Sequence, residues 1–445
     1  KVSYGVGAIG KDMVYSIVSG FLLYYYNTVL GISATFIGIL FMAARIFDAI
    51  NDPFMGIVVE KTNTRFGKFR PWILIGTVLS AICLFGMYAV PRSLVGTPLL
   101  IYISITYVLW GITYTLMDIP YWSMIPAISQ NVKDRENISV IARSCAGLGF
   151  AIPTALTMLV VPMLGIDERQ GFKVFAGIIA VFFIISTLIT VINVKEKVKP
   201  AEKSPTIKEM FSALLKNDQA LIVVVTIVMF NASIYLTSNL AIYFFKYDIG
   251  DGALFGLFGI VGGATQILSM TLLPILRKKW DRMKIFSVSI IISIIGYGLL
   301  FLLGTLHITN IILLCLAAVI IYFGFGLATV LTTIFLADTV DYGELKTKQR
   351  SESVIFSMQT FVVKLASAIS ALIAGIGLDI IKLNPDLSLQ SNETLLGMRV
   401  LMIIVPIIGL YISVLYFRKN YKLSEDNIEQ IKIELNDIKK LKQSN

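Results

Sequence analysis

The chain has 445 residues, of which 56% are hydrophobic and only 15% carry a charge. Water-soluble proteins carry about a quarter charged residues, so this composition excludes an ordinary soluble enzyme or regulator. The formal net charge of +10 would suit a nucleic-acid-binding protein. However, the charged residues gather between long apolar runs. The sequence therefore predicts a membrane protein that does not bind nucleic acid.

Long apolar runs recur along the whole chain, and a run of about 20 such residues is long enough to cross the bilayer core. These runs predict an all-α membrane protein with about twelve transmembrane helices. In chain order the helices are expected near residues 5–30, 34–59, 72–91, 98–124, 140–165, 173–194, 219–245, 253–276, 285–304, 309–337, 353–378 and 394–417.

A charged segment in the middle of the chain contains Pro200 and Pro205 and separates two sets of predicted helices. This layout is typical of transporters that are built from two similar halves. The apolar residues of the tail recur at roughly helical spacing, which predicts an amphipathic helix lying on the bundle, with a partner-binding helix as the alternative. The expected parts are an N-terminal half (1–194), a central cytoplasmic loop (195–218), a C-terminal half (219–417) and a cytoplasmic tail (418–445).

Most Lys and Arg residues fall on one side when the predicted helices cross the membrane alternately. By the positive-inside rule, that side is the cytoplasm, and both termini are expected there. We attribute the net positive charge to this topology and to contact with membrane lipids. The basic segments are Lys61–Arg70, Lys195–Lys216, Arg277–Lys284, Lys346–Arg350 and the tail.

Cysteine and histidine give no sign of metal or redox chemistry. Cys83, Cys145 and Cys315 fall in apolar runs, so we expect packing residues rather than disulfides or metal ligands. His307 is the only histidine and falls in a short outer loop, which excludes a histidine-based metal site.

Several ionisable residues fall inside the predicted spans. A charge at the bilayer centre costs roughly 2.5–3.5 kcal/mol on insertion scales, so such residues are expected to face the bundle interior or a water-filled cavity. Structural ion pairs between helices are the alternative explanation. The residues are Lys11, Asp12, Arg45, Asp48, Asp52, Asp118, Arg143 and Lys364.

The second predicted span contains the sequence RIFDAINDP, which places Asp48, Asn51 and Asp52 on one helix face. Two carboxylates and a carboxamide offer hard oxygen ligands, which suit Na⁺ or another hard cation. Thr115 of the fourth span adds a hydroxyl oxygen. Arg45 lies one turn earlier, on a neighbouring face. Two acids one turn apart repel each other and therefore favour a bound cation.

The fourth predicted span contains WGITYTLMDIPYW, in which Asp118 and Trp122 suggest sugar contacts. A carboxylate accepts hydrogen bonds from hydroxyl groups, and an indole packs under a pyranose ring. Pro120 is expected to kink this helix, as is common near transport sites. Two groups of charges result. The two negative charges of Asp48 and Asp52 are balanced by Lys364 together with one cation. The formal charges of the second group already sum to zero, which suits a neutral, hydroxyl-rich solute; this group consists of Lys11, Asp12, Asp118 and Arg143.

The chain resembles the melibiose carriers of the glycoside–pentoside–hexuronide:cation symporter family from about residue 1 to residue 430. Each matching motif is short, but together and in this order they are specific. The motifs are YGVGAIGKD (4–12), RIFDAINDP (45–53), TRFGKFRPWILIGT (64–77), WGITYTLMDIPYWSMIP (110–126), KNDQ (216–219), ADTVDYGELK (337–346) and SMQTFVVK (357–364).

The resemblance implies a major facilitator fold, alternating access, and symport of a galactoside with Na⁺, Li⁺ or H⁺. It also implies a cation site at Asp48, Asn51, Asp52 and Thr115. For the sugar site it implies Asp12, Asp118, Trp122 and Arg143, together with Lys364 and its neighbours Thr360 and Gln359 on a late helix. Arg45 and Lys364 are expected to serve coupling and charge balance, and Lys11 to join the sugar site.

Two positions depart from the melibiose carriers, because Ser19 and Thr329 stand where those proteins have aromatic residues. Both changes are expected to reshape the pocket and leave the identity of the sugar open. Uronide carriers of the same family lack an acid at the position of Asp118, so its presence here favours a neutral glycoside.

The sequence thus predicts a symporter in a bacterial plasma membrane, which carries a small neutral galactoside with a monovalent cation. No covalent bond changes, so the protein is not expected to be an enzyme or to need a cofactor beyond the transported ion. One alternative is a carrier of the same fold for a pentoside, a uronide or a lipid-like solute. Another alternative is a sugar sensor that binds without transport.

Overall fold

The computed structural model describes residues 2–62, 64–128, 132–196, 212, 215–347, 352–387 and 389–443. Within these residues all regular structure is helical, apart from an isolated bridge between Thr64 and Gly67. Most of the predicted central loop lies outside the described residues. The chain divides into two compact units: unit 1 comprises Lys1–Ser204, Asp251–Gly256 and Leu378–Leu389, and unit 2 comprises Pro205–Gly250, Leu257–Gly377 and Gln390–Asn445.

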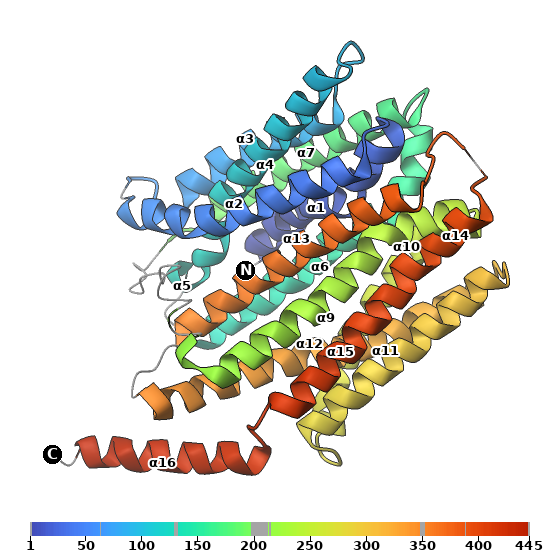
Figure 1. Cartoon of the computed structure of the whole chain (residues 1–445). Coiled ribbons are helices and arrows are strands. Elements are labelled where there is room, and N and C mark those ends of the chain that lie inside the picture. The colour runs from blue at the N-terminus through green and yellow to red at the C-terminus, as the bar shows by residue number, and fades with distance from the viewer. Residues whose placement is uncertain are drawn as a thin grey trace. The chain divides into compact units, whose positions relative to one another are not determined.

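Unit 1 contains the helices that follow the first half of the sequence. Within it, α1 packs against α6 and α7, α3 packs against α4 and α7, and α2 packs against α4. Figure 1 shows these long helices side by side. Their bounds are α1 (Val2–Tyr24), η1 (Tyr25–Val29), α2 (Ala34–Lys61), α3 (Arg70–Tyr88), α4 (Thr97–Ser123), α5 (Ile125–Ile128), α6 (Val132–Val160), η2 (Val161–Met163) and α7 (Glu168–Asn193).

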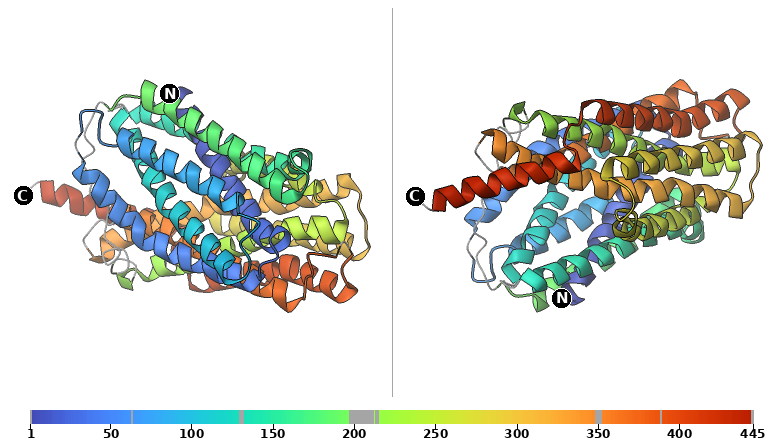
Figure 2. Two further views of the ribbon diagram at one scale, coloured as in Figure 1. Left: turned by 90° about the horizontal axis from the view of Figure 1, so that it is seen from above. Right: turned by 90° about the horizontal axis from the view of Figure 1, so that it is seen from below.

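Unit 2 contains most of the remaining helices. Here α9 packs against α15 and α12, α11 packs against α12 and α15, and the tail helix α16 packs against α12. Figure 2 shows the helices of this unit from two further sides. Their bounds are α9 (Asp218–Tyr243), η3 (Phe244–Ile249), α10 (Leu254–Leu276), α11 (Arg282–Thr305), α12 (Ile311–Thr347), α13 (Glu352–Ile380), α14 (Asn392–Arg399), η4 (Val400–Ile404), α15 (Val405–Asn420) and α16 (Glu425–Gln443).

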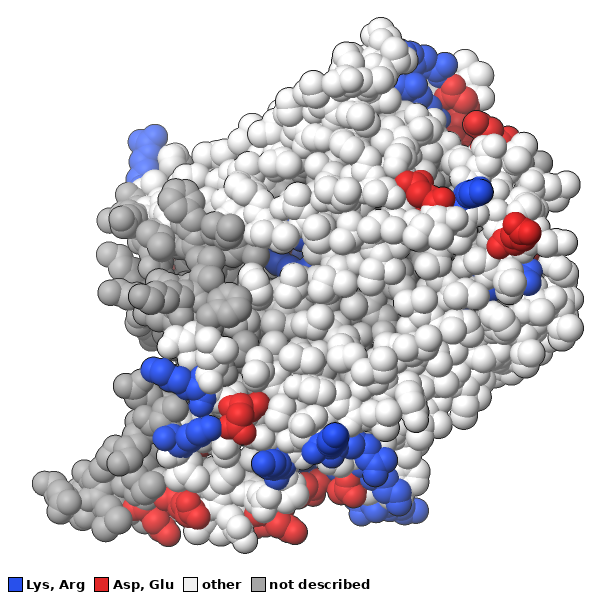
Figure 3. Space-filling view, viewed as in Figure 1, with Lys and Arg blue, Asp and Glu red and all other residues white. Residues whose placement is uncertain are grey.

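The sides of these helices have the character expected of membrane spans. Among the described residues, 11 helical segments are long and apolar enough to cross a membrane, and α2 is a further long helix. Large apolar side chains such as Ile82, Ile178 and Ile295 are exposed, as expected where lipid covers the helix. Most of the surface drawn in Figure 3 carries no charged side chain. The predicted all-α membrane fold is confirmed.

The predicted helix bounds differ from the structure mainly where a helix is longer than its apolar run. The helix predicted to end at residue 337 continues to Thr347, and the one predicted to begin at 140 starts at Val132. Hydropathy marks only the part of a helix that the bilayer surrounds. A helix continues beyond it as long as polar side chains find partners, as Asp338 does with Arg282 on α11.

The helices α1 and α9 end in the same way, which the sequence interpretation did not include. The segments YYYNTVLG (24–31) and YFFKYDIG (243–250) align without a gap. Each contains a π-helical stretch and ends on a glycine with positive φ, which is 70° at Gly31 and 87° at Gly250. Glycine adopts this backbone conformation without a steric penalty. The helix contacts also correspond, because α3 packs against α4 and α7 in unit 1, and α11 packs against α12 and α15 in unit 2. Both observations support two related halves.

A loop of each unit is held by a glutamate that follows the last candidate membrane span of the same unit. Glu196 accepts hydrogen bonds from the backbone N–H groups of Lys68, Phe69 and Arg70, at 2.7, 2.9 and 3.0 Å. Glu425 accepts from the backbone N–H of Arg282 at 3.0 Å. Both carboxylates thus cap the N-terminus of a helix, where unpaired N–H groups favour negative charge.

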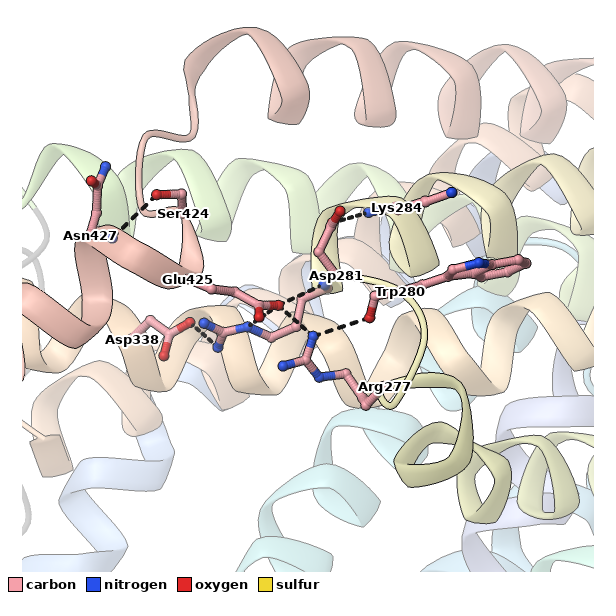
Figure 4. Close-up of polar contacts among 9 residues, drawn as sticks. Arg277, Trp280, Asp281, Lys284, Asp338, Ser424, Glu425 and Asn427 are labelled. Atoms are coloured by element: carbon pink, nitrogen blue, oxygen red, sulfur yellow. Dashed lines mark hydrogen bonds and ion pairs between the residues drawn. The ribbon is translucent and has the colours of Figure 1, made fainter.

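The tail helix begins at a charged cluster, which Figure 4 shows. Glu425 forms an ion pair with Arg277, and Arg282 lies with its Nη1 2.6 Å from Oδ2 of Asp338. Further along α16, Ile428 and Leu435 are buried. The predicted amphipathic tail helix therefore packs on unit 2 through its apolar face and through Glu425.

We expect acid to loosen the start of α16. The hydrogen bond from Arg277 holds the pKa of the Glu425 carboxyl below its ordinary value. Because the pKa is lowered in the folded state, this contact stabilises docking at pH values above about 4.3, the ordinary value for glutamate, and is lost as pH falls through the lower folded value. The distance between spin labels at positions 284 and 433, in a cysteine-free background, should stay constant from pH 8 to pH 5 and broaden below about pH 4.

A substitution tests the same contact at neutral pH. Glu425→Gln should broaden the label distance at pH 7, because the neutral amide binds the two arginines less strongly. Glu429→Gln, at an exposed position of the same helix, is the matched control and should leave the distance unchanged. An unaltered distance in Glu425→Gln would show that the apolar face alone holds the tail.

Candidate functional site

Unit 1 brings most of the predicted site residues together in two neighbouring groups. We call the first group the Lys11 cluster; it consists of Lys11 and Asp12 of α1, Asp118 and Trp122 of α4, and Arg143 of α6. The second group, the α2 cluster, consists of Arg45, Asp48, Asn51 and Asp52 of α2 with Thr115 of α4. Both groups depend on α4, because Thr115 and Asp118 lie less than one helical turn apart.

Lys11 is the centre of its cluster. Its Nζ lies 2.8 Å from Oδ1 of Asp118 and 3.3 Å from Oδ2 of Asp12. The side chain of Lys11 is only 5% exposed, whereas that of Asp118 is 31% exposed. The cation is therefore enclosed, while the carboxylate of Asp118 keeps room to accept further hydrogen bonds. This is the grouping that the sequence analysis expected of these charges.

An indole forms one wall of the Lys11 cluster. The Nζ of Lys11 lies 5.1 Å from the ring centroid of Trp122, and the guanidinium carbon of Arg143 lies 5.3 Å from it. Two cations within about 6 Å of an aromatic ring are in the range of cation–π attraction. With the carboxylates of Asp12 and Asp118, which lie against Lys11, the two cations give the cluster no formal net charge. Such a site favours a solute that is itself neutral.

The α2 cluster is held against α4 by close contacts. Thr115 Oγ1 donates to Oδ1 of Asp52 at 3.2 Å. A Cβ atom at Gly111 would lie 3.0 Å from Oδ1 of Asp48, so this glycine lets α4 approach the carboxylate. The side-chain nitrogen of Asn51 is buried and has no hydrogen-bond partner among the described residues. Two of the predicted oxygen ligands, Asp48 and Asp52 of α2, therefore lie against α4, which carries Thr115.

Arg45 reaches from its neighbouring face to a carboxylate of the α2 cluster. Its Nη1 lies 3.3 Å from Oδ2 of Asp48, although its position in the sequence places it on a neighbouring face of the helix. Residues three apart on a helix are neighbours, and a long side chain spans the remaining angle. Two carboxylates and one guanidinium leave a single negative charge. The formal charge of these three side chains therefore favours a monovalent cation.

The remaining predicted site residues belong to unit 2. Lys364 lies on α13, as does Gln359, whose side-chain nitrogen donates to Thr333 Oγ1 at 3.2 Å. Thr360 belongs to the same helix, but its side chain lies outside the described part of the chain. The roles of Lys364 and Thr360 therefore stay predictions.

Two tyrosines that were not predicted as site residues connect the clusters. Tyr114 lies 3.5 Å from Nζ of Lys11 through its hydroxyl oxygen, and its ring centroid lies 6.1 Å from that of Tyr15. The guanidinium carbon of Arg45 lies 5.9 Å from the ring centroid of Tyr15. A signal existed, because Tyr114 lies four positions before Asp118 and thus on the same helix face.

Known proteins resemble the chain over almost its full length. The family model described as MFS/sugar transport protein matches residues 3–425. The isoprimeverose transporter of Lactiplantibacillus pentosus is 28% identical over 419 residues, which cover 93% of this chain and 86% of that protein. The raffinose carrier protein of Pediococcus pentosaceus is 27% identical over 459 residues, which cover 98% of this chain and 71% of that protein.

A solved structure supports the same fold. The nucleoside transporter NupG superposes with a TM-score of 0.68 at 15% sequence identity, covering 95% of this chain and 99% of that one. At this identity the likeness concerns the fold alone, and together with the family match it confirms the predicted major facilitator architecture. The family match, which spans most of the chain, establishes the rest: the protein is a membrane transporter rather than an enzyme, and it belongs to the MFS/sugar transport protein family.

Proposed function

We propose that the protein is a secondary symporter that couples inward transport of a galactoside to Na⁺, Li⁺ or H⁺ by alternating access. The observation that carries the proposal is that two clusters share α4. The Lys11 cluster is neutral, and the α2 cluster is anionic. The ion is a transported substrate, and no cofactor is required. Relatives that are named as sugar carriers support this class of substrate.

The Lys11 cluster supports a neutral glycoside. The partly exposed carboxylate of Asp118, which Lys11 holds in place, accepts hydrogen bonds from hydroxyl groups, and the exposed guanidinium of Arg143 donates to sugar oxygens. The indole of Trp122 provides an apolar face for a sugar ring. A uronide would bring a further negative charge beside Asp12 and Asp118, which such a balanced site disfavours.

The α2 cluster supports a single monovalent cation. Asp48, Asp52, Asn51 and Thr115 provide the hard oxygen atoms that suit Na⁺ or Li⁺, and a proton needs only one of the carboxylates. Arg45 already neutralises part of the negative charge of Asp48.

We further propose that the protein lies in a bacterial plasma membrane with the basic loop Lys61–Arg70 and the helix α16 in the cytoplasm. The concentration of Lys and Arg on this side supports the orientation. In the alternating-access scheme, the two units then expose the clusters to each side of the membrane in turn.

Uptake into vesicles tests the proposal against its alternatives. Purified protein in liposomes should accumulate a radiolabelled α-galactoside only when an inward gradient of Na⁺, Li⁺ or protons is present. A panel of galactosides, glucosides, pentosides and uronides would identify the preferred substrate. Binding without accumulation would instead support a sensor, and accumulation of a uronide alone would refute the galactoside assignment.

Two substitutions should separate Na⁺ from H⁺ as the coupling ion. Thr115→Val and Asn51→Ala each remove one neutral oxygen from the α2 cluster. Each should lower the affinity for Na⁺ about tenfold, because the lost ligand is worth about as much as one charge-assisted hydrogen bond. Proton coupling should persist, because a proton needs only a carboxylate. Isothermal titration with Na⁺ and proton-driven uptake measure the two effects. Unchanged Na⁺ affinity in both variants would remove these residues from the site.

A further inference from the structure

Two buried tyrosines join the start of α1 to the end of α4. The Tyr4 hydroxyl donates to the backbone carbonyl of Tyr121 at 2.5 Å, and the Tyr121 hydroxyl donates in return to the backbone carbonyl of Tyr4. The two rings are stacked, with centroids 4.5 Å apart and planes 14° from parallel. Each residue is 1% exposed. We call this reciprocal arrangement the tyrosine clasp.

The clasp lies at the C-terminal end of α4, where some backbone hydrogen bonds within the helix are missing. The last carbonyl groups of a helix have no partner within it, and Tyr121 lies in the last turn of α4, which ends at Ser123. Pro120, inside the same turn, has no N–H to donate to the carbonyl four residues earlier. The Tyr121 carbonyl accepts a long hydrogen bond from the backbone N–H of Met124, at 3.3 Å, and the hydroxyl of Tyr4 adds a second partner from another helix.

Trp122 follows the clasp directly and depends on its geometry. Its ring meets that of Tyr121 edge to face, with centroids 5.8 Å apart and an interplanar angle of 87°. The same indole lies between the cations Lys11 and Arg143, as described above. Because the backbone of Tyr121 is fixed to α1, the Cα–Cβ bond of Trp122 is fixed relative to Lys11 on that helix.

We propose that Tyr4 is a positioning residue for sugar binding, which acts through Tyr121 to hold the indole of Trp122 in the Lys11 cluster. The inference rests on the proposed sugar site, but the position of the indole is a property of the protein without ligand. The clasp fixes one wall of the site in advance, so that sugar binding does not have to order it. Such preorganisation raises affinity because it lowers the cost of binding.

The test uses Tyr4→Phe, which removes one hydrogen bond and keeps the ring stack. Tyr88→Phe is the matched control, because the Tyr88 hydroxyl also donates from a buried position to a carbonyl of α1, that of Ile17, at 2.7 Å. Fluorine NMR of protein containing 5-fluorotryptophan reports each of the four tryptophans, and Trp122→Phe assigns the signal of Trp122. Sugar affinity is measured by calorimetry with melibiose, and Na⁺ affinity is measured without sugar.

We expect Tyr4→Phe to shift and broaden the Trp122 signal while the signals of the other tryptophans stay in place. Melibiose affinity should fall about tenfold, and Na⁺ affinity without sugar should stay within about twofold of the parent. Tyr88→Phe should change neither quantity. If Tyr4→Phe does not fold, Tyr121→Phe removes the reciprocal hydrogen bond and should give the same signature.

Two outcomes overturn the inference. The first is an unchanged Trp122 signal and unchanged melibiose affinity in the Tyr4 variant. The second is an equal response in Tyr88→Phe, which would show a general loss of packing. A protein whose Trp122 signal responds as expected, but whose parent form binds none of the sugars tested, would keep the clasp and refute the proposed sugar site.

Discussion

Asp118→Ala is expected to lower galactoside affinity by about two to four orders of magnitude while Na⁺ still binds. The carboxylate of Asp118 is the most exposed acid of the Lys11 cluster and lies 2.8 Å from the ammonium group. Two charge-assisted hydrogen bonds to sugar hydroxyls are worth about 1.5–3 kcal/mol each. Their loss corresponds to about 10²- to 10⁴-fold in affinity.

Two further variants separate the contributions to this effect. Asp118→Asn keeps the ability to accept hydrogen bonds but removes the charge opposite Lys11, so its loss should be smaller than that of Asp118→Ala. Asp12→Ala should also lower sugar affinity, because Lys11 would lose its second carboxylate. Calorimetric titration with melibiose, at saturating Na⁺, measures all three. If affinity in both alanine variants stays within about twofold of the parent, the Lys11 cluster is not the sugar site.

The fold followed from the sequence because membrane spans have a simple physical signature. Long apolar runs give helices directly, since a backbone in lipid must satisfy its own hydrogen bonds. The π-helical turns after α1 and α9 did not follow, because hydropathy does not distinguish one helical hydrogen-bond pattern from another. Their aligned sequences, ending in Gly31 and Gly250, carried a repeat signal that only the structure made visible.

The candidate site followed from the sequence as far as single helices go. The spacing of Asp48, Asn51 and Asp52 fixes a common face on α2 without any knowledge of the neighbouring helix. The contact of Arg45 with Asp48 did not follow, because it depends on the conformation of a long side chain. The tyrosine clasp joins residues 117 positions apart, and no local pattern predicts such a pair.

Asp52→Asn is expected to abolish cation-driven accumulation and the effect of Na⁺ on sugar affinity. Asp52 accepts the hydrogen bond from Thr115, so a cation at Asp52 would fix the rotation of α4 and with it Asp118. Without a cation, the negative charge of the α2 cluster should let α2 and α4 separate. In the parent protein, Na⁺ should therefore raise sugar affinity, and sugar should raise Na⁺ affinity by the same factor, typically about 5- to 150-fold.

The amide of Asp52→Asn still accepts the hydrogen bond from Thr115 but carries no charge, so the variant separates attraction of the cation from contact with α4. Sugar affinity should fall to the value that the parent shows without Na⁺, and it should no longer change when Na⁺ is added. Uptake driven by any of the three cations should be lost, although the sugar should still move across the membrane down its own concentration gradient. Equal sugar affinity with and without Na⁺ in the parent would refute the coupling, because the coupling free energy between the two binding sites would then be zero.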